Sequence, residues 1–208
     1  MKTRENWVLM TATVVAVVSL AAGAVYAFNT ADLEKLKTTN QCQGCDLTNA
    51  ELSNAKLSGA DLFLAKLSGA DLQGADLSGA SLYVATLSHA NLSDVNMRNT
   101  SLSHATADGV NLINADLSGA NLHTVKMSGA NLRNANLANA RLTYAVLKNS
   151  WLIGVDMTGA DMTGADFSGA DLTRTILSRV KLSGADFSGA TWTDGIICKE
   201  GSYGECKK

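Results

Sequence analysis

The stretch KLSGADLQGADLSGASL, from Lys66 to Leu82, decides the fold of this 208-residue chain. A leucine returns at every fifth residue, and a small residue follows three positions after each. On an α-helix, five residues turn through about 500°, so successive leucines would scatter around the axis. On a strand, an odd spacing sends alternate leucines to opposite faces. The leucines can therefore share one interior only if the backbone bends by the same amount every five residues.

The same period continues far beyond this stretch. Residues 46–195 divide into thirty consecutive pentapeptides without insertion or deletion. The second position is Leu in 22 of them, and the fifth is Ala in 21. The first position is mostly Asp, Asn, Lys, Ser or Thr, whereas the third and fourth are mostly Ser, Thr, Gly and Asn.

The third and fourth positions can supply the required bend, because Gly and Asn tolerate turn geometry. A chain that bends regularly coils, and each coil can stack on the one before it, as in other repeat proteins. The leucines then line a continuous core. Ala107 stands where a Leu is expected, and it predicts a small void or a local inward shift of the chain.

The segments ADLSGASL (75–82), ADLSGANL (115–122) and ANLRNANL (130–137) resemble the pentapeptide repeat family, whose unit is A-(D/N)-L-x-x. The resemblance covers 150 of the 208 residues. It implies an all-β fold, a right-handed quadrilateral parallel β-helix with four pentapeptides in each coil. The Leu and the small residue of each unit would point inward.

The first segment is expected to lie outside this fold. Lys2 and Arg4 precede an apolar run from Trp7 to Phe28, and AGAVYA ends the run with small residues. This pattern is typical of a secretory signal cleaved after Ala27. The alternative is an uncleaved anchor in the inner membrane formed by residues 7–28, since the run is long enough to span. Both predict that the rest of the chain is exported to a periplasm, a thylakoid lumen or the medium.

Caps are expected at both ends of the array, because an open coil exposes unpaired strand edges. Residues 28–45 form the predicted N-terminal cap, with a short amphipathic helix over 29–41, Thr30 as its N-cap, and Leu33 and Leu36 covering the first coil. Residues 196–208 form the predicted C-terminal cap. Trp192, Ile196 and Ile197 are expected to close the last coil.

Four cysteines flank the array: Cys42 and Cys45 before it, Cys198 and Cys206 after it. The two pairs lie at opposite ends of the predicted rod, which excludes a shared zinc site. The strand–helix context of a thioredoxin-like motif is also missing. In an exported protein we expect disulfides, with Cys198–Cys206 closing a small loop. Cys42 and Cys45 fall in a Leu slot and a small-residue slot, so they could instead be buried thiols.

Composition and motifs point away from catalysis. The chain has three histidines, and it lacks H-E-x-x-H, G-x-S-x-G and a glycine-rich phosphate loop. Asp and Asn at the first position are expected to solvate the surface or to bond the turn backbone. We therefore expect no enzyme activity, no metal and no cofactor.

One wall of the predicted rod differs from the other three. If residues twenty apart stack, Phe63–Leu64, Tyr83–Val84, Ser103–His104, His123–Thr124 and Thr143–Tyr144 form one outward row. Neighbours in this row would lie about 4.8 Å apart, close enough for rings to stack. A contiguous apolar and aromatic patch indicates a partner site, although stacked rings could also serve only to stabilise the wall. A smaller group outside this row comprises Ile113, Trp151 and Ile153.

Two functions remain open at this point. The first is a non-enzymatic structural or protein-interaction module outside the cytoplasm, which binds a protein or a second copy of itself through the row from Phe63 to Tyr144. The second follows from the resemblance, because some family members mimic DNA and protect type II topoisomerases from inhibitors. Mimicry requires a cytoplasmic and strongly acidic rod, whereas this array holds 14 acidic and 10 basic residues, interspersed, behind an export signal. The absence of a basic stripe disfavours nucleic-acid binding.

Overall fold

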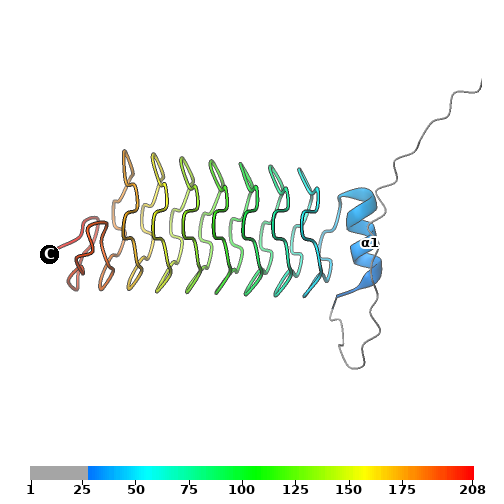
Figure 1. Cartoon of the computed structure of the whole chain (residues 1–208), viewed down its shortest axis with the longest axis horizontal. Coiled ribbons are helices and arrows are strands. Elements are labelled where there is room, and N and C mark those ends of the chain that lie inside the picture. Colours follow the sequence, from blue (N-terminus) through cyan, green and yellow to red (C-terminus); the bar gives the residue numbers. More distant parts are fainter. Residues whose placement is uncertain (1–27) are drawn as a thin grey trace, which may run out of the picture.

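The chain from residue 28 to residue 208 forms a rod of stacked coils, which we describe from a computed structural model (Figure 1). Parallel β-bridges join each first-position residue to the residue twenty positions later, from Gln41–Asp61 through to Asp171–Thr191. A shift of twenty residues is four pentapeptides per coil. The predicted repeat solenoid and its stacking of residues twenty apart are therefore confirmed. The coil begins at Gln41, one pentapeptide before the predicted start of the array.

The strands of this solenoid are single bridging residues, because a turn interrupts the chain within every pentapeptide. The unit 121–125 shows where the backbone N–H groups bond. Those of Leu122 and Thr124 donate to the following coil at 2.8 and 2.9 Å, and that of Asn121 donates to the preceding coil at 2.9 Å. The N–H of Val125 closes the turn, and that of His123 bonds the side chain of Asn121. Each unit can thus satisfy its backbone without long strands.

The turns have the same backbone geometry throughout. Every fourth-position residue from Gly44 to Gly189 has a positive φ, and the fifth-position N–H donates to the second-position carbonyl in nearly all units. A positive φ at this point of a hydrogen-bonded turn is the type II geometry, which favours Gly and Asn. The expectation that the third and fourth positions, rich in Gly and Asn, bend the chain is confirmed.

The core is a column of second- and fifth-position side chains that runs the length of the rod. Nearly all of these residues between Cys42 and Ala190 are buried. Near the C-terminal end the column becomes aromatic, where the rings of Phe167 and Phe187 stack 5.5 Å apart and Trp192 meets Phe187 edge-on at 4.9 Å. At Ala107 the bridges on either side keep the regular register, and its N–H bonds the next coil at 2.7 Å. The ladder of hydrogen bonds thus continues through Ala107, and the small void or local inward shift stays a prediction.

Helix α1 (Thr30–Thr39) covers the N-terminal end of the rod (Figure 1). Its N-cap is Asn29, whose side chain accepts from the N–H of Ala31, so the sequence-based choice of Thr30 was wrong by one residue. Leu36 is buried against the first coil, and the Asp32 carboxylate accepts from the exposed-edge N–H of Asp46 at 2.8 Å. The helix thus covers both apolar surface and an unpaired strand edge.

The C-terminal segment folds back on the last coil through antiparallel bridges, Asp186–Tyr203 and Thr191–Ile197. Trp192 packs on the core, whereas Ile196 and Ile197 are 46% and 66% exposed. The prediction that both isoleucines close the last coil was wrong, because the chain leaves the fivefold period after Trp192 and turns them outward. Among residues 28–208 no helix is long and apolar enough to cross a membrane. The proposed signal or anchor lies outside the described residues.

Candidate functional site: an aromatic wall

The candidate site is one long side of the rod, built by the pentapeptides 61–65, 81–85, 101–105, 121–125 and 141–145. We call it the aromatic wall. It consists of the third- and fourth-position side chains of these units, namely Phe63, Leu64, Tyr83, Val84, Ser103, His104, His123, Thr124, Thr143 and Tyr144. The bridges 61–81, 81–101, 101–121 and 121–141 place the five units on consecutive coils.

Rings on the aromatic wall form an unbroken ladder along the rod. Phe63 and Tyr83 stack with centroids 5.9 Å apart and planes 9° apart. Edge-to-face contacts then continue from Tyr83 to His104 at 5.4 Å, to His123 at 5.6 Å and to Tyr144 at 6.0 Å. Such contacts are worth about 0.5–1.5 kcal/mol each beyond the area that they bury. The ladder therefore stabilises the wall and also holds its rings in fixed positions.

Each coil of the aromatic wall carries one ring. Where the ring stands at the fourth position, the third position is a small hydroxyl residue, Ser103 or Thr143, and both are buried. Where the ring stands at the third position, the fourth is Leu64, Val84 or Thr124. Tyr144 is 60% exposed and ends the ladder. Its ring lies over Gly164, so close that a Cβ atom added to this glycine would be 2.6 Å from the ring.

The backbone under the aromatic wall is strained. Leu64, Val84, His104, Thr124 and Tyr144 all have φ between 54° and 60°. Left-handed backbone costs an L-residue about 1–2 kcal/mol, and β-branched residues such as Val84 and Thr124 adopt it least readily. Elsewhere the fourth position is mostly Gly or Asn, which adopt this geometry readily. Five consecutive coils thus carry unfavourable residues on this side, and strain of this kind clusters at functional sites.

The two histidines of the wall are held by neighbouring threonines. Thr124 Oγ1 lies within hydrogen-bond distance of the carbonyl oxygen of His123, at 2.7 Å, and of His104 Nδ1, at 2.8 Å. His123 Nδ1 lies 2.7 Å from Thr143 Oγ1. Within residues 28–208 no group of three or more His, Cys, Asp or Glu side chains could hold a metal ion. Both histidine rings take part in the ladder.

The four cysteines lie at the two ends of the rod, away from the wall. Cys42 and Cys45 are joined at 2.11 Å, and both are buried in the slots that Leu and Ala fill elsewhere. Cys198 and Cys206 are joined at 2.05 Å and close the C-terminal loop. In the structure the disulfide and the buried position of Cys42 and Cys45 thus coexist, although the sequence suggested them as alternatives.

A second surface group lies two pentapeptides further along the coils, on the wall opposite the aromatic wall. The guanidinium of Arg133 lies 4.9 Å from the centre of the Trp151 ring, which is 46% exposed. Ile113 and Ile153 are half-buried beside them in the same row of units. The turns of this wall carry mostly Asn and Gly at the fourth position, so it lacks the strain of the aromatic wall.

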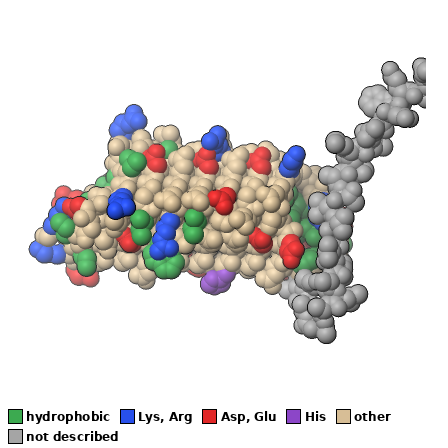
Figure 2. All heavy atoms as spheres, in the orientation of Figure 1, with side chains coloured by type: hydrophobic (Ala, Val, Ile, Leu, Met, Phe, Trp, Pro, Cys, Tyr) green, Lys and Arg blue, Asp and Glu red, His purple; other side chains and the backbone are tan. Residues whose placement is uncertain are grey.

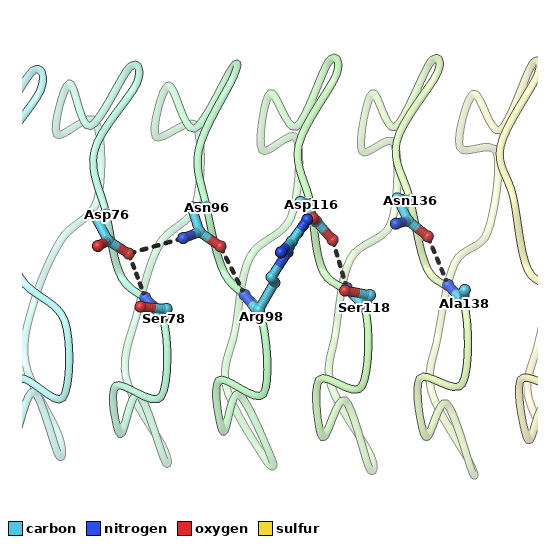
Figure 3. Close-up of polar contacts among 8 residues, drawn as sticks. All are labelled: Asp76, Ser78, Asn96, Arg98, Asp116, Ser118, Asn136 and Ala138. Atoms are coloured by element: carbon cyan, nitrogen blue, oxygen red, sulfur yellow. Dashed lines mark hydrogen bonds and ion pairs between the residues drawn. The ribbon is translucent and has the colours of Figure 1, made fainter.

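First-position Asp and Asn residues bond the turn backbone and each other, as expected. In the row drawn in Figure 3, the Oδ1 atoms of Asp76 and Asn96 accept from the N–H two residues on, at 3.0 and 3.3 Å. Asn96 also donates its amide to Asp76 Oδ1 at 3.0 Å. Acids and amides alternate along this row, Asp76, Asn96, Asp116, Asn136 and Asp156, which keeps carboxylates off adjacent coils.

The alternation predicts the effect of Asn96→Asp. The hydroxyl and backbone N–H of Ser78 hold the pKa of Asp76 below its usual value, so this carboxylate stabilises the fold at neutral pH and ceases to do so as pH falls through its lowered pKa. A carboxylate at 96 removes the amide donor and adds like charge, which raises the pKa of the pair. We expect the variant to lose about 1 kcal/mol at pH 7.

The loss should shrink as pH falls below about 4, because protonation removes the repulsion. Urea unfolding of wild type and variant at pH 7 and about pH 3.5 measures it. Asp76→Asn in the same background is the control, since it removes one of the two adjacent carboxylate pairs, 76–96 and 96–116, and should restore part of the stability at pH 7. A loss that is equal at both pH values would contradict the charge explanation.

Comparison with known proteins agrees with this architecture. The family model for pentapeptide repeats matches residues 41–63, 65–103, 85–123, 96–134, 120–159, 140–179 and 152–189. No curated protein sequence matches the chain. Among solved structures, it is similar to HetL, a pentapeptide repeat protein involved in heterocyst differentiation regulation from the cyanobacterium Nostoc sp. strain PCC 7120. The identity is 28%, the match covers 76% of this chain and 80% of HetL, and the TM-score is 0.65.

Two further solved structures match more distantly. QnrB1, a plasmid-mediated fluoroquinolone resistance protein, is 24% identical, with 76% of this chain and 84% of that one covered and a TM-score of 0.45. Rfr23, a pentapeptide repeat protein from the cyanobacterium Cyanothece 51142, is 26% identical, with 78% and 98% covered and a TM-score of 0.34. The family match spans most of the chain and coincides with the coils, so this protein belongs to the pentapeptide repeat family.

Proposed function

We propose that this protein is a non-enzymatic interaction module that works outside the cytoplasm and binds a protein through the aromatic wall. The observation that carries the proposal is the strain on this one side of the rod, where Leu64, Val84 and Tyr144 occupy backbone positions suited to Gly or Asn. A wall that served stability alone would gain more from Gly or Asn at these positions. Exposed Tyr side chains in a rigid surface are typical anchors of protein interfaces.

The charge pattern supports this proposal over DNA mimicry. Basic residues pair with acidic residues on neighbouring coils, as in Lys66–Asp46, Arg98–Asp116 and Lys148–Asp166. Figure 2 shows charges of both signs scattered along the visible face. Mimicry of DNA would need rows of unpaired acidic groups spaced like phosphates.

Affinity capture tests the proposal. The C-terminally tagged protein is cross-linked in extracts of the exported fraction, and its captured proteins are compared with those of a Phe63→Ser, Tyr83→Ser, Tyr144→Ser variant. An Ile113→Ser, Trp151→Ser, Ile153→Ser variant on the opposite wall is the matched control. We expect the first variant to lose the main captured protein and the control to keep it. Identical lists for all three proteins would overturn the proposal.

Export predicts a specific mass for the mature protein. If the signal is cleaved after Ala27 and both disulfides form, the intact mass should correspond to a chain that begins at Phe28 and lacks two hydrogens per disulfide. Mass spectrometry of the fractionated product, with and without reduction, measures both features. A full-length and reduced protein in the cytosol would contradict export and would favour the topoisomerase-binding alternative.

A further inference from the structure

We infer that the aromatic wall binds a second copy of this chain, with the two rods antiparallel and a two-fold axis through the coil of Ser103 and His104. This inference rests on the proposed function and names its partner. It depends on the spacing of the wall, on the order of large and small residues along it, and on the charges at its border.

Spacing restricts the occupants that can contact all five coils. Wall residues repeat about every 4.8 Å, because neighbouring coils are joined by parallel β-bridges. An α-helix laid along the rod repeats at 5.4 Å per turn, and side chains on one face of an extended strand repeat at about 6.6–6.8 Å, so both lose register. A second rod has the same spacing and stays in register along the whole wall.

The order of residues is self-complementary in an antiparallel pair. A two-fold axis across the rods at coil 101–105 places coil 61–65 opposite coil 141–145 and coil 81–85 opposite coil 121–125. The Phe63 ring then lies opposite Thr143, which is buried beneath its neighbours, and the Tyr144 ring lies opposite Leu64. Tyr83 lies opposite His123, so a ring pair forms near the centre. Large side chains therefore meet smaller ones at both ends of the contact.

The border of the wall carries matching charges. First-position residues of the same five coils are Asp61, Ser81, Ser101, Asn121 and Arg141. In the antiparallel pair Asp61 lies opposite Arg141 of the second copy, and the symmetry makes this pair twice. Neither residue takes part in a salt bridge among residues 28–208, so both charges are free to pair with the second copy. Within the rod Asp61 accepts hydrogen bonds from Gln43 and from the N–H of Phe63, and Arg141 donates one to Thr143. A parallel pair would instead place Arg141 opposite Val146 and leave it without an acid.

The contact is small. Five coils give a row about 24 Å long, so the buried surface lies near the lower limit of about 1,200 Å² for stable complexes. We therefore expect a reversible dimer that dissociates in the micromolar range rather than an obligate one.

Sedimentation equilibrium of the mature protein over a wide concentration range tests the inference, with three variants. Arg141→Asp alone places like charges opposite each other at two symmetric sites, and we expect it to weaken association about tenfold or more. Asp61→Arg alone should do the same, and the double variant should restore association. In a parallel dimer Arg141→Asp would change little and the double variant would not recover. Circular dichroism and thermal unfolding of each variant show whether it folds.

The outcomes separate this inference from the proposed function. A wild-type protein that stays monomeric at all concentrations, together with capture that still depends on the wall, would overturn the dimer and leave the proposed function standing. A dimer that is unaffected by the charge variants and by Tyr83→Ser would place the contact elsewhere and overturn the inference. Capture lists that do not depend on the wall would overturn the proposed function itself.

Discussion

Phe167→Ala should lower the free energy of unfolding by about 3–5 kcal/mol, the largest loss that we expect from a single substitution. Phe167 is fully buried, stacks on Phe187 at 5.5 Å, and fills a slot that holds Leu in most coils. Removing the ring leaves a cavity that neighbouring coils cannot close, because their backbones are fixed by bridges on both sides. Urea unfolding followed by circular dichroism measures the loss.

Phe167→Leu is the matched control for this substitution. Leu is the usual residue of the slot, so the variant should lose no more than about 1.5 kcal/mol. The contact between Phe187 and Trp192 lies one coil further on, and it should persist in the control. A loss below about 1 kcal/mol for Phe167→Ala would show that the end of the rod collapses around the gap, contrary to the rigid column described above.

The fold followed from the sequence because one rule repeats thirty times. The fivefold period required a bend in every unit, and the Gly and Asn residues of the fourth position indicated where it lies. The period did not determine how many units close a coil, since any number of equal bends would repeat in fives. That number came from the family resemblance, and the bridges between residues twenty apart confirm it.

The residues of the aromatic wall could be named from the sequence once the coil length was assumed, because stacking then reduces to counting in twenties. The backbone strain of the wall could not be predicted, since a sequence does not show that Val84 and Thr124 adopt the same backbone as Gly and Asn elsewhere. The sequence did hold one indication of this strain: at the fourth position of this wall, five consecutive coils carry residues other than Gly and Asn. Outside the period the predictions were weaker, as the N-cap at Asn29 and the exposed Ile196 and Ile197 show.

Val84→Asn should raise the free energy of unfolding by about 1–2 kcal/mol while it weakens association through the wall. Asn adopts the left-handed backbone at many equivalent positions, namely 49, 54, 99, 114, 134, 139 and 149. The strain that Val84 stores is about 1–2 kcal/mol, and the side chain is only half-buried, so little packing is lost in exchange. Few surface substitutions that remove an apolar side chain stabilise a protein. A rise in the free energy of unfolding would therefore indicate that the backbone at Val84 is strained.

The reverse substitution on an unstrained wall completes the argument. Asn139→Val moves a β-branched residue into the same geometry, with φ 58° in the wild type, and it should destabilise by a similar amount without changing association. Urea unfolding gives the free energy of unfolding of each variant, and sedimentation gives the strength of its self-association. If Val84→Asn destabilises the rod, the backbone under the aromatic wall is not strained in the way its φ angles indicate. If it stabilises the rod and leaves association unchanged, the strain exists but the wall does not bind through Val84. A more stable rod that no longer associates would show that this wall keeps its strained residues for binding and loses stability by doing so.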